Sequence, residues 1–200
     1  MSSRWAVLLR GVNVGGVTVR SADLRSALAE AGFIDVRTVL ASGNALVTVG
    51  GDGDGTGADA PPADELDGAD VRARVEAALL VRFGREVRVV VLSQVALTAV
   101  VDACPYAADS ETHHAYVVLL GDPDAAGTAF ETVAAVVPTP GASAAGEVDE
   151  AVAAGVGVLY WWCPRGSSLS TPVSKAVERL SRTSLTTTRN LRTLARLTHG

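Results

Sequence analysis

The chain has 200 residues, 48% of them hydrophobic, and a formal net charge of -5. This apolar content is enough for one sizeable domain or two small ones without disulfides or metals, and the acidic balance argues against a protein that coats nucleic acid over its whole surface. The N-terminal apolar run is broken by Arg10, and no run reaches about 18 apolar residues, so we expect neither a signal peptide nor a membrane span. We therefore expect a cytoplasmic protein.

The first half of the chain has the pattern of a βαββαβ unit. Segments with the apolar pattern of a strand alternate along the chain with segments that have the apolar spacing of a helix. Ser42, Gly43 and Asn44 suit a tight hairpin between two β-rich segments. The predicted elements are a strand at 4–9, a helix from Ser21 to Gly32, strands at 36–40 and 45–49, a helix from about residue 69 to Gly84, and a strand at 86–92.

The second half repeats this order loosely. Its predicted elements are a linking helix capped by Ser93, a strand at 115–121, a helix at 124–137, strands at 144–151 and 155–162, and helices at 172–182 and 189–198. The βαββαβ order is that of the ferredoxin-like motif. We predict an α+β fold of two ferredoxin-like halves with antiparallel sheets and C-terminal helices, divided into domains 1–92 and 93–200.

Charge is unevenly distributed along the chain. Residues 50–70 include seven acids and no base, and the Gly/Asp/Pro-rich stretch 50–68 has too few apolar residues to pack, so it is predicted to be a flexible insertion. This stretch begins like a calcium loop but has Ala63 where the loop needs Glu. Residues 163–200 hold seven bases and one acid.

The glycine-rich stretch RGVNVGG (10–16) follows the first strand directly. It comes one residue short of a P-loop, because Val17 stands in the position of the phosphate-binding lysine. Two interpretations stay open. Arg10, Asn13 and the backbone amides are candidates to hold an anion, or Asn13 and the glycines only supply the left-handed conformations of a plain turn.

Two predicted helix starts carry cations. In STPVSKAVERL (170–180), Ser170 or Thr171 is the candidate cap and Lys175, the one lysine of the chain, lies on the polar side. Helix N-termini attract anions and disfavour cations, so a cation there is easier to accommodate if an anion lies nearby.

The segment TTTRN (186–190) also places a cation, Arg189, at a predicted helix start. Thr187 or Thr188 is the candidate cap of the last helix, which leaves Arg189 and Asn190 beside the free amides of its first turn. For these residues, too, the alternative is a merely solvated surface position.

Four stretches together resemble the bacterial family catalogued as domain of unknown function 1697. They are RGVNVGG (10–16), ASGNALV (41–47), Ser174-Lys175 and TTRNLRTL (187–194). The resemblance covers essentially the whole chain and implies a cytoplasmic α+β protein of two ferredoxin-like halves without an established activity. Leu191 and Leu40 stand where family members often carry aromatic residues.

The sequence patterns and the family resemblance select one set of polar loop and helix-start residues, and such positions often carry binding groups. We hypothesise that they hold a small phosphorylated or carboxylated ligand in a cleft between the two halves, in a protein that either binds this ligand or acts on it as an enzyme. The candidate ligand-binding residues are Arg10, Asn13, Gly15, Gly16, Ser42, Asn44, Ser174, Lys175, Thr188, Arg189 and Asn190.

Two other classes of function stay open: a nucleic-acid binder that uses the basic segment 163–200, and a protein-interaction module. No catalytic residue, cofactor or metal site is predicted, and the oligomeric state does not follow from the sequence. Cys104 and Cys163 have no metal-ligand spacing and are expected to be core thiols. His113 and His114 are expected to be structural, and as neighbours on a strand at most one of them can face a site.

Overall fold

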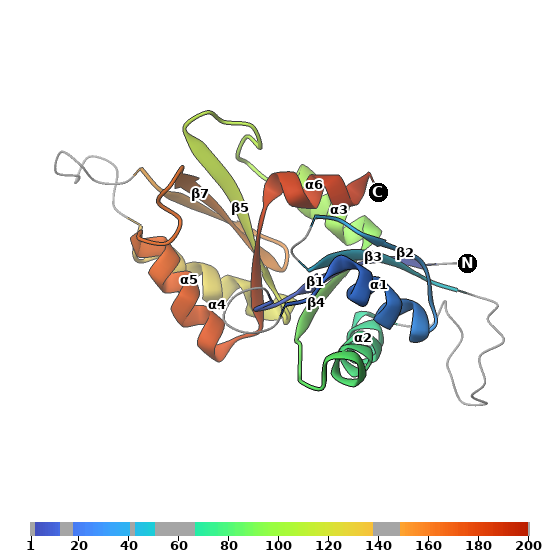
Figure 1. Cartoon of the computed structure of the whole chain (residues 1–200). Coiled ribbons are helices and arrows are strands. Elements are labelled where there is room, and N and C mark those ends of the chain that lie inside the picture. Colours follow the sequence, from blue (N-terminus) through green and yellow to red (C-terminus); the bar gives the residue numbers. More distant parts are fainter. Residues whose placement is uncertain (1–2, 13–17, 41–42, 51–66, 138–148, 200) are drawn as a thin grey trace. The chain divides into compact units, whose positions relative to one another are not determined.

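A computed structural model describes residues 3–12, 18–40, 43–50, 67–137 and 149–199 (Figure 1). The chain divides into two compact units. Unit 1 comprises Met1–Thr98 with Arg196–Gly200, and unit 2 comprises Ala99–Ala195. The predicted division into domains 1–92 and 93–200 stays a prediction.

Unit 1 is a four-stranded antiparallel sheet with the strand order β2-β3-β1-β4 and two helices. Its elements are β1 (Ser3–Leu9), α1 (Ser21–Glu30), β2 (Phe33–Thr38), β3 (Asn44–Val49), α2 (Gly68–Phe83) and β4 (Val89–Ser93). The helix α3 (Gln94–Asp102) follows β4 and begins with the predicted cap, because Ser93 Oγ accepts a hydrogen bond from the Ala96 amide at 3.2 Å.

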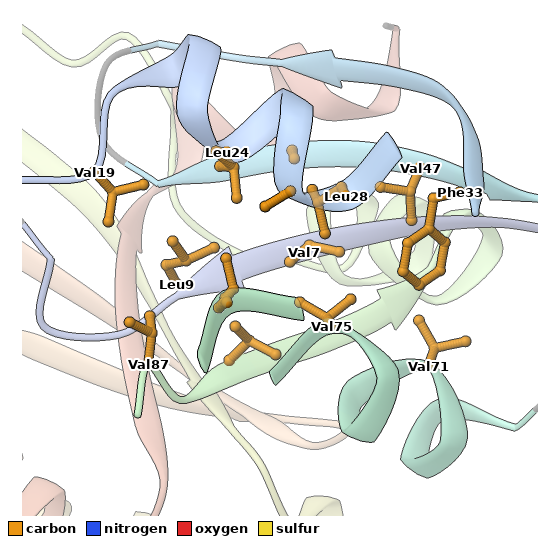
Figure 2. Close-up of a cluster of buried hydrophobic side chains, with 14 of the residues drawn as sticks. Val7, Leu9, Val19, Leu24, Leu28, Phe33, Val47, Val71, Val75 and Val87 are labelled. Atoms are coloured by element: carbon orange, nitrogen blue, oxygen red, sulfur yellow. The ribbon is translucent and has the colours of Figure 1, made fainter. Parts of the chain in front are cut away.

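The core of unit 1 lies between α1, α2 and one face of the sheet. Figure 2 shows Leu24 and Leu28 of α1 and Val75 of α2 pointing toward Val7 and Leu9 of β1. The apolar residues of both helices recur at helical spacing, so burial of one stripe fixes each helix on the sheet.

Local signals mark the ends of the helices in unit 1. Asp67 caps α2 in a capping box with Asp70, and Gly84 ends α2 in the left-handed conformation, as its position predicted. The predicted cap of α1 is wrong: Ser21 is the first helical residue, and the cap position holds Arg20, which makes no side-chain cap bond.

Unit 2 has the same topology. Its elements are β5 (His113–Leu120), a short 3-10 helix η1 (Pro123–Ala125), α4 (Ala126–Ala134), β6 (Ala151–Gly155), β7 (Val158–Pro164), α5 (Pro172–Thr183) and β8 (Thr186–Asn190). The helix α6 (Leu191–Thr198) follows β8, and its last residues belong to unit 1. The sheet is antiparallel with the order β6-β7-β5-β8, which is the order of unit 1 when strands are counted from the first strand of each unit. Both halves are therefore ferredoxin-like, as predicted.

The core of unit 2 lies where α4 and α5 pack on the sheet. Val118 and Leu120 of β5 and Leu159 of β7 are buried there, together with Val133 of α4 and Val173 of α5. Figure 1 shows α4 and α5 side by side. Because β5 and β7 are antiparallel and each is followed by one of these helices, α4 and α5 run in opposite directions.

Two predicted elements of unit 2 are wrong in their bounds or type. TTTRN (186–190) is the strand β8 and not a helix start, because its β-branched threonines pair with β5 in the register Val118–Thr188. The strand predicted at 144–151 is β6, Ala151–Gly155, and residues 144–148 lie outside the described part of the chain. The predicted insertion at 50–68 also lies largely outside the described residues.

Hydrogen bonds within unit 1 join the start of α3 to the end of α6. Gln94, the first residue of α3, donates its side-chain amide to the carbonyls of Leu197 and Thr198 at 3.2 and 2.9 Å. Gln94 thereby satisfies two carbonyls at the C-terminal end of α6. Among the described residues, no helix has the length and apolar character needed to cross a membrane.

Candidate functional site

The candidate ligand-binding residues fall into three groups. Asn13, Gly15, Gly16 and Ser42 lie outside the described residues. Arg10 and Asn44 belong to unit 1. Ser174, Lys175, Thr188, Arg189 and Asn190 belong to unit 2. The joint site in a cleft between the halves stays a prediction.

In unit 1, the structure brings the two N-terminal family stretches together. Leu9 donates its backbone N–H to the Gly43 carbonyl at 2.8 Å, and Arg10 donates to the Arg88 carbonyl at 2.9 Å. Gly43 has a φ of +70°, and a Cβ there would lie 2.7 Å from Val12 Cγ2 and 2.9 Å from Leu9 Cβ. Only glycine fits this close approach, so the end of β1 and the turn before β3 form one packed edge.

Asn44 is fully buried and closes the turn between β2 and β3. Its side-chain Nδ2 donates to the Val39 carbonyl at 3.2 Å, and its backbone carbonyl accepts from Val39 N at 2.9 Å. Between these two residues, Leu40 adopts a φ of 60°, in the left-handed region. The side-chain amide of Asn44 thus stabilises this turn.

The start of α5 is capped from within the chain. Thr171 Oγ1 accepts from Ser174 N at 3.0 Å, and Ser174 Oγ donates to the Thr171 carbonyl at 2.8 Å. Of the two predicted candidates, Ser170 and Thr171, the cap is therefore Thr171. Lys175 is exposed.

A buried carboxylate lies at the same helix start. Glu150 Oε1 accepts from Trp161 Nε1 at 2.7 Å, and Glu150 Oε2 accepts from Val173 N at 3.4 Å. A carboxylate is stabilising at the positive end of a helix, so the chain itself supplies an anion to the start of α5. The neighbouring Cys163 is buried, and burial together with the Glu150 charge raises the pKa of its thiol to about 11.

The strand β8 and the start of α6 carry the last candidates. Asn190 Oδ1 accepts from Arg192 N at 2.9 Å, which makes Asn190 the cap of α6 instead of the predicted Thr187 or Thr188. Arg189 donates through Nη1 to Thr187 Oγ1 at 2.6 Å and to the Thr188 carbonyl at 3.0 Å. Burial lowers the pKa of Arg189 to about 10, so its guanidinium stays charged at neutral pH.

The structure adds a basic group that the sequence did not single out. Arg165 donates through Nη2 and Nε to the Ser110 carbonyl at 2.6 and 3.2 Å, and Arg192 donates through Nε to the Ala108 carbonyl at 2.7 Å. Burial, and then the charges of Arg165 and Arg192, lower the pKa of His114. We call His114, Arg165 and Arg192 the arginine cluster.

The two adjacent histidines of β5 divide as strand alternation requires. His113 stacks on Trp162 with ring centroids 4.8 Å apart, and its Nε2 lies 3.0 Å from the Asp149 carbonyl oxygen. His114 makes an edge contact with Tyr116 at 5.8 Å and belongs to the arginine cluster. The sequence indicated that at most one of the two histidines can face a site, but it did not indicate which one.

The aromatic residues of unit 2 are engaged in contacts within the unit. Trp162 stacks on Tyr106 as well as on His113. Trp161 is buried and bound to Glu150, and the buried Tyr160 donates its hydroxyl to the Val100 carbonyl at 2.8 Å. Tyr160 and Trp161 are therefore enclosed within unit 2, whereas Trp162 and Tyr106 are half-buried.

Metal binding finds no support in the described residues, since no three His, Cys, Asp or Glu side chains there are grouped closely enough to hold an ion. Cys104 and Cys163 are free thiols.

The topology of the two units defines an α+β protein of two ferredoxin-like halves. The family model described as a protein of unknown function (DUF1697) matches residues 2–147, and the chain belongs to this family. The stretches at 10–16 and 41–47 that suggested the family lie within the matched residues. The stretches at 174–175 and 187–194 follow them.

A solved structure has the same fold. It is that of the conserved bacterial protein SP0830 from Streptococcus pneumoniae, with a TM-score of 0.70, 20% sequence identity, and coverage of 100% of this chain and 98% of that chain. At this identity the similarity concerns the fold alone. No curated protein matches the chain.

Proposed function

We propose that the chain binds a small phosphorylated or carboxylated ligand at the arginine cluster of unit 2. The observation that carries this proposal is that Arg165 and Arg192 are held on the carbonyls of Ser110 and Ala108, two residues apart in one loop. In the described part of the chain, neither arginine forms an ion pair.

The way the two arginines are held supports the proposal. Each guanidinium is fixed by a backbone carbonyl and keeps other N–H groups for a ligand. A guanidinium offers five donors in a planar fork that suits the oxygens of phosphate and carboxylate. Donors that are already fixed lose less side-chain entropy on binding, which favours affinity.

The α6 terminus supports the same ligand chemistry. Arg192 lies in the first turn of α6, behind the Asn190 cap, where backbone amides and the helix dipole favour negative charge. Thr188, Arg189 and Asn190 lead directly into this turn, so we keep them as candidate contacts of the ligand.

The experiment is a thermal-shift and calorimetric titration of the full chain with inorganic phosphate, pyrophosphate and sugar phosphates. A ligand that binds only the native state raises its melting temperature. We expect Arg192→Ala to weaken binding about tenfold or more, which corresponds to the loss of a charge-assisted hydrogen bond. Arg196→Ala, an exposed arginine of the same helix, is the matched control.

Two results would overturn the proposal. One is that none of these anions stabilises the wild type. The other is that Arg192→Ala and Arg196→Ala bind the anion equally well. The predictions for Arg10, Asn13, Gly15, Gly16, Ser42, Asn44, Ser174 and Lys175 remain separate, and Arg10→Ala and Lys175→Ala in the same titration test two of them.

Binding of RNA or DNA through residues 163–200 is the second candidate, because this segment has seven bases and one acid. A short single-stranded oligonucleotide distinguishes it from the first. Its affinity should fall steeply between 50 and about 200 mM salt if phosphate contacts dominate, whereas a small ligand on fixed donors should respond mildly.

A further inference from the structure

A groove of about 430 Å³ lies between α4 and α5 on unit 2, away from the residues used so far. One wall consists of small side chains, Ala125 at the end of η1 and Thr128, Ala129 and Thr132 of α4. These positions recur at the spacing of one helix face, and their short side chains leave space between α4 and α5. The opposite wall is the C-terminal half of α5, including Leu180 and Arg179.

The groove has an apolar middle and a basic end. Ala129 and Leu180 both line the groove and belong to the packed core of unit 2. Because α4 and α5 run in opposite directions, Thr132 lies toward the end of the groove that holds Arg179. The stretch from Ala125, just before α4, to Thr132 is about 10 Å long at 1.5 Å per residue. An occupant therefore has to be elongated, apolar along its length and anionic at one end.

The charges on α5 support this reading of the basic end. Arg182 is paired with Glu178 at 2.7 Å, whereas neither Arg179 nor Lys175 forms an ion pair among the described residues. Lys175 lies four residues before Arg179 and therefore on the same side of the helix. Both side chains are exposed, so an anion can reach them.

We propose that this groove binds a single-chain aliphatic carboxylate, with its alkyl chain along Ala129 and Leu180 and its carboxylate on Arg179. The alkyl chain removes apolar surface of both helices from water, and the guanidinium pairs with the carboxylate. The site is separate from the arginine cluster, and the proposal does not depend on the function proposed above.

Octanoate is the probe, titrated into the full chain by calorimetry beside butanoate, hexanoate and 1-octanol. We expect affinity to rise up to about fourfold for each added methylene, the change that corresponds to burial of one CH₂. We expect 1-octanol to bind at least tenfold more weakly than octanoate, because it lacks the charge. Equal affinities of octanoate and 1-octanol would overturn the role of Arg179.

Two pairs of variants locate the site. Thr128→Trp fills the groove from an exposed position, whereas Gly127→Trp adds the same bulk next to it, where a Cβ meets no atom within 4 Å. Arg179→Gln removes the charge in the groove, and Arg182→Gln removes a neighbouring charge outside it. We expect Thr128→Trp to abolish octanoate binding, Arg179→Gln to weaken it about tenfold, and both controls to leave it unchanged.

Three further results would overturn the groove proposal. Octanoate binding that is lost in Arg192→Ala would place the carboxylate at the arginine cluster and overturn the groove proposal. A wild type that dimerises in sedimentation velocity and dissociates as Thr128→Trp would show that a second copy covers the groove, which also overturns it. A folded Thr128→Trp variant, by circular dichroism, that binds octanoate like the wild type would do the same.

Discussion

The carboxylate of Glu150 and the indole of Trp161 form a buried hydrogen bond of 2.7 Å. The second carboxylate oxygen accepts from the backbone of Val173, so Glu150 joins β7 to the first turn of α5. Glu150 has 6% of its surface exposed, which leaves its oxygens little access to water. Its partners must therefore come from the chain.

We predict that Glu150→Ala lowers the free energy of unfolding by about 1–3 kcal/mol, because it leaves the Trp161 N–H buried without an acceptor. Glu150→Gln keeps an acceptor oxygen and should lose less. Urea unfolding of the full chain measures both. Glu131→Ala, at an exposed position of α4, should change stability by less than about 0.5 kcal/mol. Equal effects of Glu150→Ala and Glu131→Ala would contradict the structural role of Glu150.

The second prediction concerns the proton of His114. Burial and the charges of Arg165 and Arg192 place the pKa of His114 below its ordinary 6.5. Below pH 6.5 the unfolded chain therefore binds a proton at His114 that the folded chain does not bind. His114 thus contributes to the free energy of unfolding above pH 6.5, and this contribution falls as the pH drops toward the pKa of the folded protein. Arg192→Ala should raise the pKa of His114 in an NMR titration, while Arg196→Ala should leave it in place.

A third prediction links this pKa to the ligand. An anion bound at the arginine cluster favours protonated His114, so saturating phosphate should raise the pKa of His114 and phosphate should bind more tightly at pH 6 than at pH 8. Inorganic phosphate itself changes from mostly dianion to mostly monoanion between pH 8 and pH 6. Sulfate, which stays a dianion over this range, is therefore the control anion. A pKa of His114 that does not move with either anion would argue against binding beside it.

The fourth prediction compares two glycines with almost the same backbone conformation. Gly43 and Gly84 have φ values of +70° and +67°, but a Cβ at Gly43 would collide with Val12 and Leu9, and a Cβ at Gly84 meets no atom within 4 Å. Gly84→Ala should cost about 1–2 kcal/mol for the left-handed conformation alone. Gly43→Ala should cost about 1–3 kcal/mol more because it overpacks a buried edge. Equal losses in urea unfolding would mean that the end of β1 and the turn before β3 are not packed this closely.

A fifth prediction concerns the thiol of Cys163. Its burial and its pKa of about 11 keep it protonated and shielded at pH 7.5, so it should not react with an aromatic disulfide reagent in the folded protein. A Cys104→Ser variant isolates this thiol. Its modification should begin only in the urea range where the chain unfolds.

The parts of the fold that the sequence predicted rest on local physics. The caps Ser93 and Thr171 and the helix end at Gly84 follow from side-chain and backbone preferences within a few residues. The apolar periodicity of α1, α2 and α5 is equally local. The ferredoxin-like order followed from assembling these elements along the chain.

The rest depended on partners far away in the sequence. TTTRN became a strand because β5 lay beside it, and that pairing outweighed the capping preference of threonine. The arginine cluster was missed because the anchors of Arg165 and Arg192 are backbone carbonyls, which leave no trace in the residue types. The buried role of Glu150 was missed for a similar reason, since only the tertiary structure brings it to the start of α5.

The bond between Gln94 and the end of α6 has a consequence for the order of events during synthesis. Residues 196–198 belong to unit 1, yet about 100 residues separate them from Thr98. At the usual elongation rate, roughly 5 to 20 s pass between these two points on the ribosome. During that interval the first sheet and its helices have emerged while the carbonyls that Gln94 binds do not yet exist. Unit 1 is therefore the first part of the chain to begin forming and among the last to be finished.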